Sequence, residues 1–154
     1  MFLLTEGVVI MLISGLMAIA SGILMSIQGV FNTRTTEKAG LWLTNSIVHA
    51  TGFVFCLVVL FFVKDANIEG LKTVNKLYLF AGVLGAGIVY TVIVSIGKLG
   101  PAYAIMIILV AQIFSSYMIE LFGLFGTEKV PFLWTKVLGA GIMVGGIIVY
   151  QWKK

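Results

Sequence analysis

Few side chains in this sequence could do chemistry, and most of them lie inside apolar segments. Gln112, Ser116 and Glu120 follow one another at intervals of four residues, and Ser115 lies beside them. On a helix, this spacing places the side chains on one face. Polar groups inside an apolar helix are costly in lipid and tend to face a bundle interior or a water-filled cavity. We therefore expect this polar stripe to line a cavity.

Gln112 and Glu120 each allow two interpretations. Gln112 lies near the middle of its apolar segment, where its amide, with Ser115 and Ser116, could orient a small-molecule substrate. An interhelical hydrogen bond would also explain the amide. Glu120 lies nearer the end of the segment. It could pair there with a lysine such as Lys129, or it could bind a coupling proton or cation once it is desolvated.

Four other polar side chains are weaker candidates. His49 lies near the middle of an apolar segment, where it could be a hydrogen-bonded packing residue or part of a proton relay. Gln28 and Asn32 share one helix face close to the expected helix end. They could line the mouth of a cavity or cap the helix C-terminus. Tyr90 could add to the cavity wall or face lipid.

The composition argues against catalysis. The chain has one histidine, a single cysteine (Cys56) and no pair of carboxylates within its apolar segments. Nucleophilic or metal-assisted hydrolysis needs such constellations, and one cysteine forms neither an intrachain disulfide nor a thiolate cluster. We predict that the chain is not an enzyme and uses no metal or cofactor.

The elements that must position these residues follow from the distribution of charge. Only 10% of the 154 residues are charged, far below the share in a soluble domain. The charge-free stretches are 7–33, 39–63, 77–97, 99–119 and 137–152. A hydrocarbon core about 30 Å thick needs about 20 helical residues, and a snorkelling Lys136 can extend the last stretch. The pattern predicts an all-α, polytopic membrane protein, a single domain (1–154) with five transmembrane helices at about 7–32, 41–63, 77–97, 102–123 and 132–150.

Small residues form two further stripes. Ala18 and Gly22 lie four residues apart on the first helix, and Gly141 and Gly145 do so on the last. Small side chains let two helices approach closely. The contact could join helices of one chain or two chains of a dimer, and the sequence leaves both open.

The basic residues are divided equally between the two sides of the membrane. With five spans, one side holds Lys64, Lys72, Lys76, Lys129 and Lys136, and the other holds Arg34, Lys38, Lys98, Lys153 and Lys154. Orientation follows an excess of Lys and Arg on the cytoplasmic side, so this division favours neither orientation. Insertion in both orientations would allow an antiparallel homodimer, because a five-helix half forms an inverted pair only with a flipped copy. Alternatively, another determinant, such as folding of the first hairpin, fixes one orientation.

Several segments resemble one family of membrane proteins. They are Gln-Gly-Val-Phe-Asn at 28–32, Gly-Lys-Leu-Gly-Pro-Ala-Tyr at 97–103, and Ala-Gln at 111–112 with the run 119–126. From about Leu12 onward, the chain resembles the half-size, five-helix YdcZ-like branch of the drug/metabolite transporter (DMT, EamA-like) superfamily. The resemblance implies a multi-pass protein of the bacterial inner membrane that forms half of a ten-helix inverted-repeat transporter. The family commonly has Asp-His-Phe-Gly where this chain has Glu-Leu-Phe-Gly from Glu120, so the acid is kept and the histidine is absent.

Residues and resemblance together predict a secondary transporter. It would export a small metabolite or drug-like solute by alternating access, as an antiparallel, dual-topology homodimer. The sequence has no nucleotide-binding motif, which favours a gradient as the energy source. The expected partners are a second copy of the chain, membrane lipid and a small-molecule substrate, and not nucleic acid, because the basic residues flank apolar helices. A channel or facilitator, and a non-transporting subunit of a hetero-complex, are the alternatives.

Overall fold

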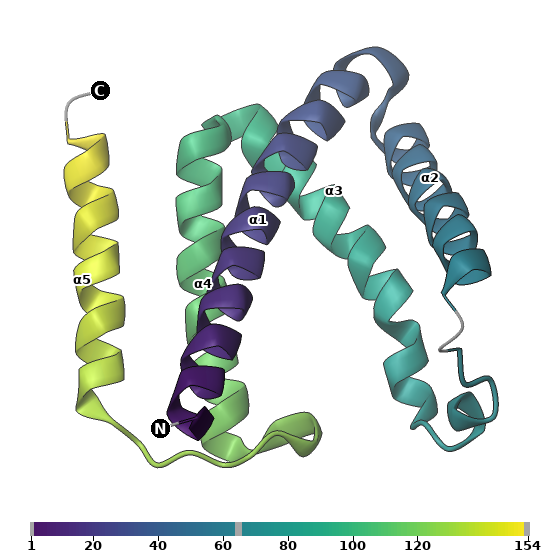
Figure 1. Cartoon of the computed structure of the whole chain (residues 1–154). Helices are drawn as coiled ribbons and strands as arrows, with labels where there is room; N and C mark the ends of the chain where they lie inside the picture. Colours follow the sequence, from purple (N-terminus) through teal and green to yellow (C-terminus); the bar gives the residue numbers. More distant parts are fainter. Residues whose placement is uncertain (1, 64–65, 153–154) are drawn as a thin grey trace. The chain divides into compact units, whose positions relative to one another are not determined.

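A computed structural model describes residues 2–63 and 66–152, with side chains from residue 6 onward. Within these residues the regular structure is entirely helical, and five helices are long and apolar enough to cross a membrane (Figure 1). They are α1 (Phe2–Ala39), α2 (Leu41–Phe62), α3 (Ala81–Leu99), α4 (Pro101–Phe122) and α5 (Trp134–Gln151). The predicted fold class, an all-α protein with five membrane-spanning helices, is confirmed.

The chain divides into two compact units. The N-terminal unit, Met1–Gly97, contains α1, α2 and most of α3, and the C-terminal unit, Lys98–Lys154, contains α4 and α5. Within the first unit α1 contacts α2, and within the second α4 contacts α5.

The first helix is longer than the sequence predicts. Its expected end lies near Asn32, whereas α1 continues to Ala39. The turn that follows contains Gly40 with φ +81° and ψ 158°, a conformation that side chains with a Cβ rarely adopt. Because α1 does not end at Asn32, the interpretation of Gln28 and Asn32 as C-terminal caps is wrong.

Local interactions carry α1 through the polar residues 33–39. The hydroxyl groups of Thr33 and Thr35 donate to main-chain oxygens four residues earlier, at 2.8 and 2.9 Å. Arg34 and Glu37 form an ion pair at 3.2 Å, about one helical turn apart. These polar side chains are therefore satisfied by the helix itself, and the polar stretch does not break it.

The same glycine turn recurs before α4. Gly100 has φ +80° and ψ 157°, close to the values of Gly40. In each turn the glycine carbonyl accepts the amide hydrogen of the residue four positions later, Thr44 or Ala104, at 3.1 Å. These two small residues are each only 1% exposed. Pro101 fits the first position of α4, where an N–H group would have no partner within the helix.

The other helix ends lie close to the predicted ones. A 3₁₀ turn, Lys76–Phe80, leads directly into α3. Helix α4 ends at Phe122 because Gly123 adopts the left-handed conformation, with φ +64°. Helix α5 begins at Trp134 rather than at the predicted residue 132, because Leu133 before it is extended.

In the N-terminal unit, α3 contacts both α1 and α2. Gly29 of α1 is buried, and a Cβ atom at this position would lie 2.7 Å from Cδ1 of Ile96 on α3. The side-chain amide of Asn45 on α2 donates to the main-chain oxygen of Ala86 on α3 at 2.9 Å. A small residue and a polar one thus allow close contact between helices, as in many membrane proteins.

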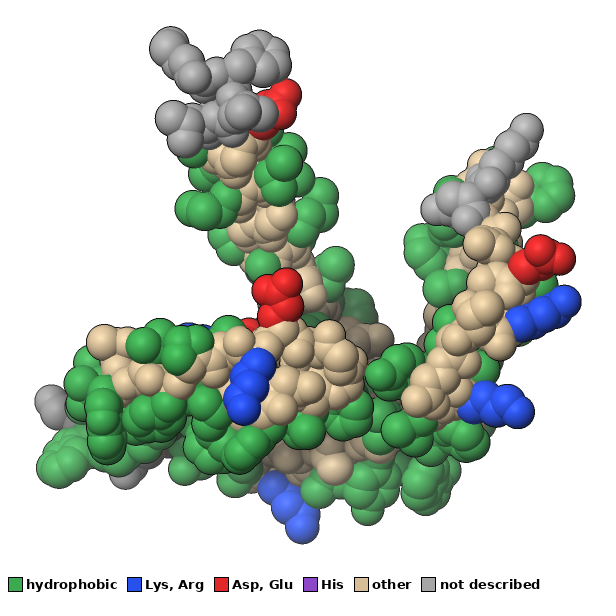
Figure 2. Space-filling view, turned by 90° about the horizontal axis from the view of Figure 1, so that it is seen from below, with side chains coloured by type: hydrophobic (Ala, Val, Ile, Leu, Met, Phe, Trp, Pro, Cys, Tyr) green, Lys and Arg blue, Asp and Glu red, His purple; other side chains and the backbone are tan. Residues whose placement is uncertain are grey.

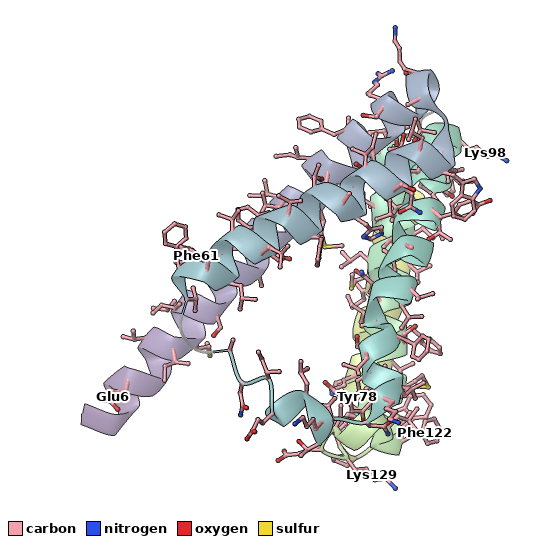
Figure 3. All side chains as sticks on the ribbon, turned by 90° about the vertical axis from the view of Figure 1, so that its right-hand side faces the viewer. Glu6, Phe61, Tyr78, Lys98, Phe122 and Lys129 are labelled. Atoms are coloured by element: carbon pink, nitrogen blue, oxygen red, sulfur yellow. The ribbon has the colours of Figure 1, made fainter. Side chains whose placement is uncertain are left out.

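Most other side chains of α1 and α2 are exposed to the surroundings. This holds for residues 6–25 and 49–63. Figure 2 shows hydrophobic side chains around the helices, with a few separate charged ones, and Phe61 points outward near the end of α2 in Figure 3. An apolar helix surface of this kind suits contact with lipid or with the helices of another chain.

Candidate functional site

A groove of about 830 Å³ lies between α4 and α5 of the C-terminal unit. Apolar and aromatic side chains form most of its lining, among them Phe114, Phe132, Trp134 and Met143. Its polar side chains are Gln112, Ser116, Tyr117, Glu120 and Lys136. Sites for small molecules typically measure about 300–1,000 Å³ and combine apolar walls with a few polar groups. The groove therefore has the size and lining of a site for a small organic molecule.

The predicted polar stripe of α4 lies along this groove. Gln112, Ser116 and Glu120 all line it, whereas Ser115 does not. Within the part of the chain that the structure describes, the Gln112 side chain makes no hydrogen bond. Its amide donor and acceptor are therefore available to a bound molecule or to another chain.

After α4 the chain turns back along the helix. The amide of Val130 donates to the main-chain oxygen of Glu120 at 3.1 Å. The amide of Leu133 then donates to the hydroxyl oxygen of Tyr117 at 2.8 Å, and Tyr117 is largely buried. These two bonds lead the chain along the end of α4, so that the first turn of α5, with Lys136, begins beside Glu120.

An ion pair forms part of the groove wall. Nζ of Lys136 lies 3.1 Å from Oε2 of Glu120 and 4.8 Å from the centre of the Tyr117 ring. The face of an aromatic ring attracts a cation, so the carboxylate and the ring both hold the ammonium group. The side chains of Lys136 and Glu120 are 39% and 46% exposed, and such pairs contribute only about 0.2–1 kcal/mol to stability.

The partner of Glu120 differs from the one suggested by the sequence. Glu120 pairs with a lysine, but with Lys136 rather than Lys129. The side chain of Lys129 extends away from the helices in Figure 3. The backbone bonds of Val130 and Leu133 explain the difference, because they carry the chain past Glu120 before α5 begins.

The remaining candidates belong to the N-terminal unit. His49 is exposed and makes no hydrogen bond within the described residues. Its ring instead lies against Gly85, where a Cβ atom would be 3.4 Å from Cε1. Gln28 is exposed, and the exposed Tyr90 ring lies 5.4 Å from the Trp42 ring.

Among the described residues of the N-terminal unit, three polar ones are buried, namely Asn32, Thr44 and Asn45. Thr44 donates its hydroxyl hydrogen to the Gly40 carbonyl at 2.9 Å, and Asn45 donates to Ala86. The structure thus gives Thr44 and Asn45 roles in helix packing, which the sequence does not predict. One signal for them is their position within a turn and a half of Gly40.

The predicted small-residue stripes face open space among the described residues of their own units. A Cβ atom added at Gly22, Gly141 or Gly145 would meet no atom within 4 Å, and Ala18 is exposed. Across residues 2–63 and 66–152, no three His, Cys, Asp or Glu side chains come together in a way that could hold a metal ion.

A comparison with known protein families assigns the chain to one of them. The family model described as "Putative inner membrane exporter, YdcZ" matches residues 13–149, nearly the whole chain. The chain belongs to the YdcZ family. This confirms the resemblance found in the sequence, and with the five apolar helices it makes the chain a multi-pass protein of the inner membrane. No curated protein and no solved structure matched the chain.

Two residues that line the groove of this YdcZ-family chain, Tyr117 and Lys136, are not predicted from the sequence to do so. Tyr117 lies three residues before Glu120, so the two residues share a helix face. In the sequence, however, Tyr117 resembles any other aromatic residue of an apolar span. Lys136 reads as an anchor at the end of a helix. Only the folded turn after α4 shows that Lys136 contacts both the Glu120 carboxylate and the Tyr117 ring.

Proposed function

We propose that the chain is a secondary transporter that exports a small solute by alternating access, as an antiparallel, dual-topology homodimer. The main observation in support of this proposal is the groove between α4 and α5. Its amide residue Gln112 lies half-way along α4, and apolar walls and an ion pair line the same space. Transporters built from inverted repeats bind their substrates near the bilayer midplane, where the two halves meet. A five-helix chain supplies one such half.

Two features support a second, inverted copy as the other half. A Cβ atom added at any glycine of α5 would meet no described atom within 4 Å, so a helix of another chain could approach these glycines closely. The five-to-five division of basic residues favours neither orientation in the membrane. Both orientations must be present for an antiparallel pair to form.

The proposal gives the residues of the groove separate roles. Gln112 and Ser116 orient the solute, and Glu120 is the site at which a proton or cation couples to transport. Lys136 is the counter-ion of Glu120 when the groove is empty. The roles of Ser115, Gln28, Tyr90 and His49 stay predictions, and the burial of Asn32 favours a packing role for it.

Cysteine labelling tests the dual topology without knowledge of the substrate. The native Cys56 is replaced by serine, and a single cysteine is placed at Ala66 or at Ala39, both of which are exposed. With five spans, these positions lie on opposite sides of the membrane. In a dual-topology population, an impermeant maleimide added outside intact cells labels about half of each variant.

The two positions act as controls for each other. Full labelling of one variant and none of the other would contradict dual topology, because every chain would then have one orientation. Cell lysis before labelling must give complete reaction of both cysteines.

A further inference from the structure

The ammonium group of Lys136 occupies a position that would hold other cations. Glu120 Oε2 lies 3.1 Å from Nζ, and the centre of the Tyr117 ring lies 4.8 Å from it. A carboxylate and an aromatic ring face attract an ammonium group whether it belongs to the protein or to a ligand. Lys136 reaches this position on a flexible stem and is partly exposed, so another cation could take its place.

The adjoining groove would accommodate the apolar body of such a ligand. The Phe132 ring lies 6.4 Å from the Tyr117 ring and 5.3 Å from the Trp134 ring, and all three residues line the groove. Aromatic walls offer a large apolar surface and further ring faces for a delocalised cation. The volume of about 830 Å³ is sufficient for a molecule with several rings.

We infer that the groove binds a lipophilic organic cation whose charged group displaces the Lys136 ammonium from Glu120 and from the Tyr117 ring. Lys136 is then a tethered competitor of the ligand. An anion would meet the Glu120 carboxylate and the negative ring face, and a neutral molecule would leave the ion pair intact. The inference rests on the proposed function, because it names the chemical class of the exported solute.

Removal of the tethered ammonium should strengthen binding. Isothermal titration calorimetry with tetraphenylphosphonium measures the affinity of the purified full-length chain in detergent micelles. Because an exposed ion pair and a cation–π contact are weak, we expect Lys136→Met to bind about three- to tenfold more tightly than the original chain. Lys136→Arg keeps the competing charge and should stay within about twofold of it. Lys129→Met is the matched control, because Lys129 extends away from the helices and should not affect the affinity (Figure 3).

The opposite result is expected when the cation loses its partners. Glu120→Gln and Tyr117→Leu should each weaken binding by about tenfold or more, whereas Tyr117→Phe keeps the ring face and should retain most of the affinity. The double variant Glu120→Gln/Lys136→Met removes both charges together, leaves neither unpaired, and should bind no better than Glu120→Gln. Tetraphenylborate has the same shape with a negative charge and should bind Lys136→Met less tightly than tetraphenylphosphonium does.

Three results would overturn the inference. The first is a Lys136→Met variant that melts at the original temperature but binds tetraphenylphosphonium no more tightly than the original chain. The second is a Tyr117→Leu variant with unchanged affinity. The third is a Lys136→Met variant that binds tetraphenylborate more tightly than tetraphenylphosphonium. If Lys136→Met does not fold, the Tyr117 and Glu120 variants decide. If the chain binds the cation but its cysteines are labelled from one side only, the dual topology is refuted and this inference stands. If the cysteines are labelled from both sides but the cation does not bind, this inference is refuted and the dual topology stands.

Discussion

Two polar side chains of the N-terminal unit and two of the C-terminal unit lie in opposite environments. In the N-terminal unit, Thr44 and Asn45 are almost completely buried and donate to backbone carbonyls of their own chain. In the C-terminal unit, Gln112 and Glu120 line an open groove, and Gln112 has no partner in the described residues. The hydrogen bonds of Thr44 and Asn45 stabilise the fold, whereas the Gln112 amide remains available to a ligand or another chain. In the sequence, polar residues with a structural role resemble those available to a ligand. Burial by the chain's own helices distinguishes the two kinds.

The largest expected effect is the loss of transport when the free amide is removed. Gln112→Leu takes a donor and an acceptor from the middle of the groove without breaking any bond within the described chain. We expect transport to fall about 100-fold, equivalent to about 2.7 kcal/mol. The free energy of unfolding should change by less than about 0.5 kcal/mol. Currents on solid-supported membranes measure transport, with the solute that responds best in a screen of metabolites and drug-like cations.

Ser115→Ala is the neighbouring control, because Ser115 lies beside the stripe but outside the groove lining. It should leave the currents within about twofold of the original. If Gln112→Leu also left the transport currents unchanged, the groove would not be the transport site. The exposed polar side chains of the C-terminal unit would then have no role in transport.

The matching substitution in the N-terminal unit should affect stability instead. Asn45→Leu removes the side-chain hydrogen bond to the Ala86 carbonyl, which joins α2 to α3. We expect a loss of about 1–2 kcal/mol in the free energy of unfolding, measured by denaturant titration in micelles. Transport per folded molecule should stay within about twofold of the original. A variant that is stable but does not transport would instead place Asn45 in the functional machinery.

The smallest effect separates two glycines of the same helix. A Cβ atom at Gly29 would lie 2.7 Å from the flexible end of Ile96, whereas at Gly22 it would meet nothing within 4 Å. Alanine favours a helix at both positions, but Ile96 must move in only one variant. We expect Gly29→Ala to be about 1 kcal/mol less stable than Gly22→Ala in the same titration. Equal stabilities would show that α1 and α3 do not pack tightly at Gly29.

The sequence predicts the parts of this structure that depend on local periodicity. The lengths of the charge-free stretches are sufficient to place five spans, and the spacing of four residues places Gln112, Ser116 and Glu120 on one side of α4. Both signals arise within single helices. They require no knowledge of which helices contact one another.

The parts that the sequence does not predict depend on how the helices are joined. The contact of Lys136 with Glu120 requires the backbone bonds that return the chain along α4, and no spacing rule contains them. The burial of Asn45 requires α3, which is distant in sequence. The extension of α1 beyond Asn32 is a different case, because polar side chains that bond within a helix resemble a loop in composition.

The ion pair near the end of α1 bears on how the chain is inserted into the membrane. The tip of the first hairpin carries Arg34, Glu37 and Lys38, and Arg34 contacts Glu37 at 3.2 Å. These three charges sum to +1, and the contact between Arg34 and Glu37 lowers the cost of moving that pair of charges through the bilayer. In the antiparallel dimer proposed above, this tip would cross the bilayer in one of the two copies. A salt bridge that contributes little to folding would then lower the cost of inserting the proposed inverted copy.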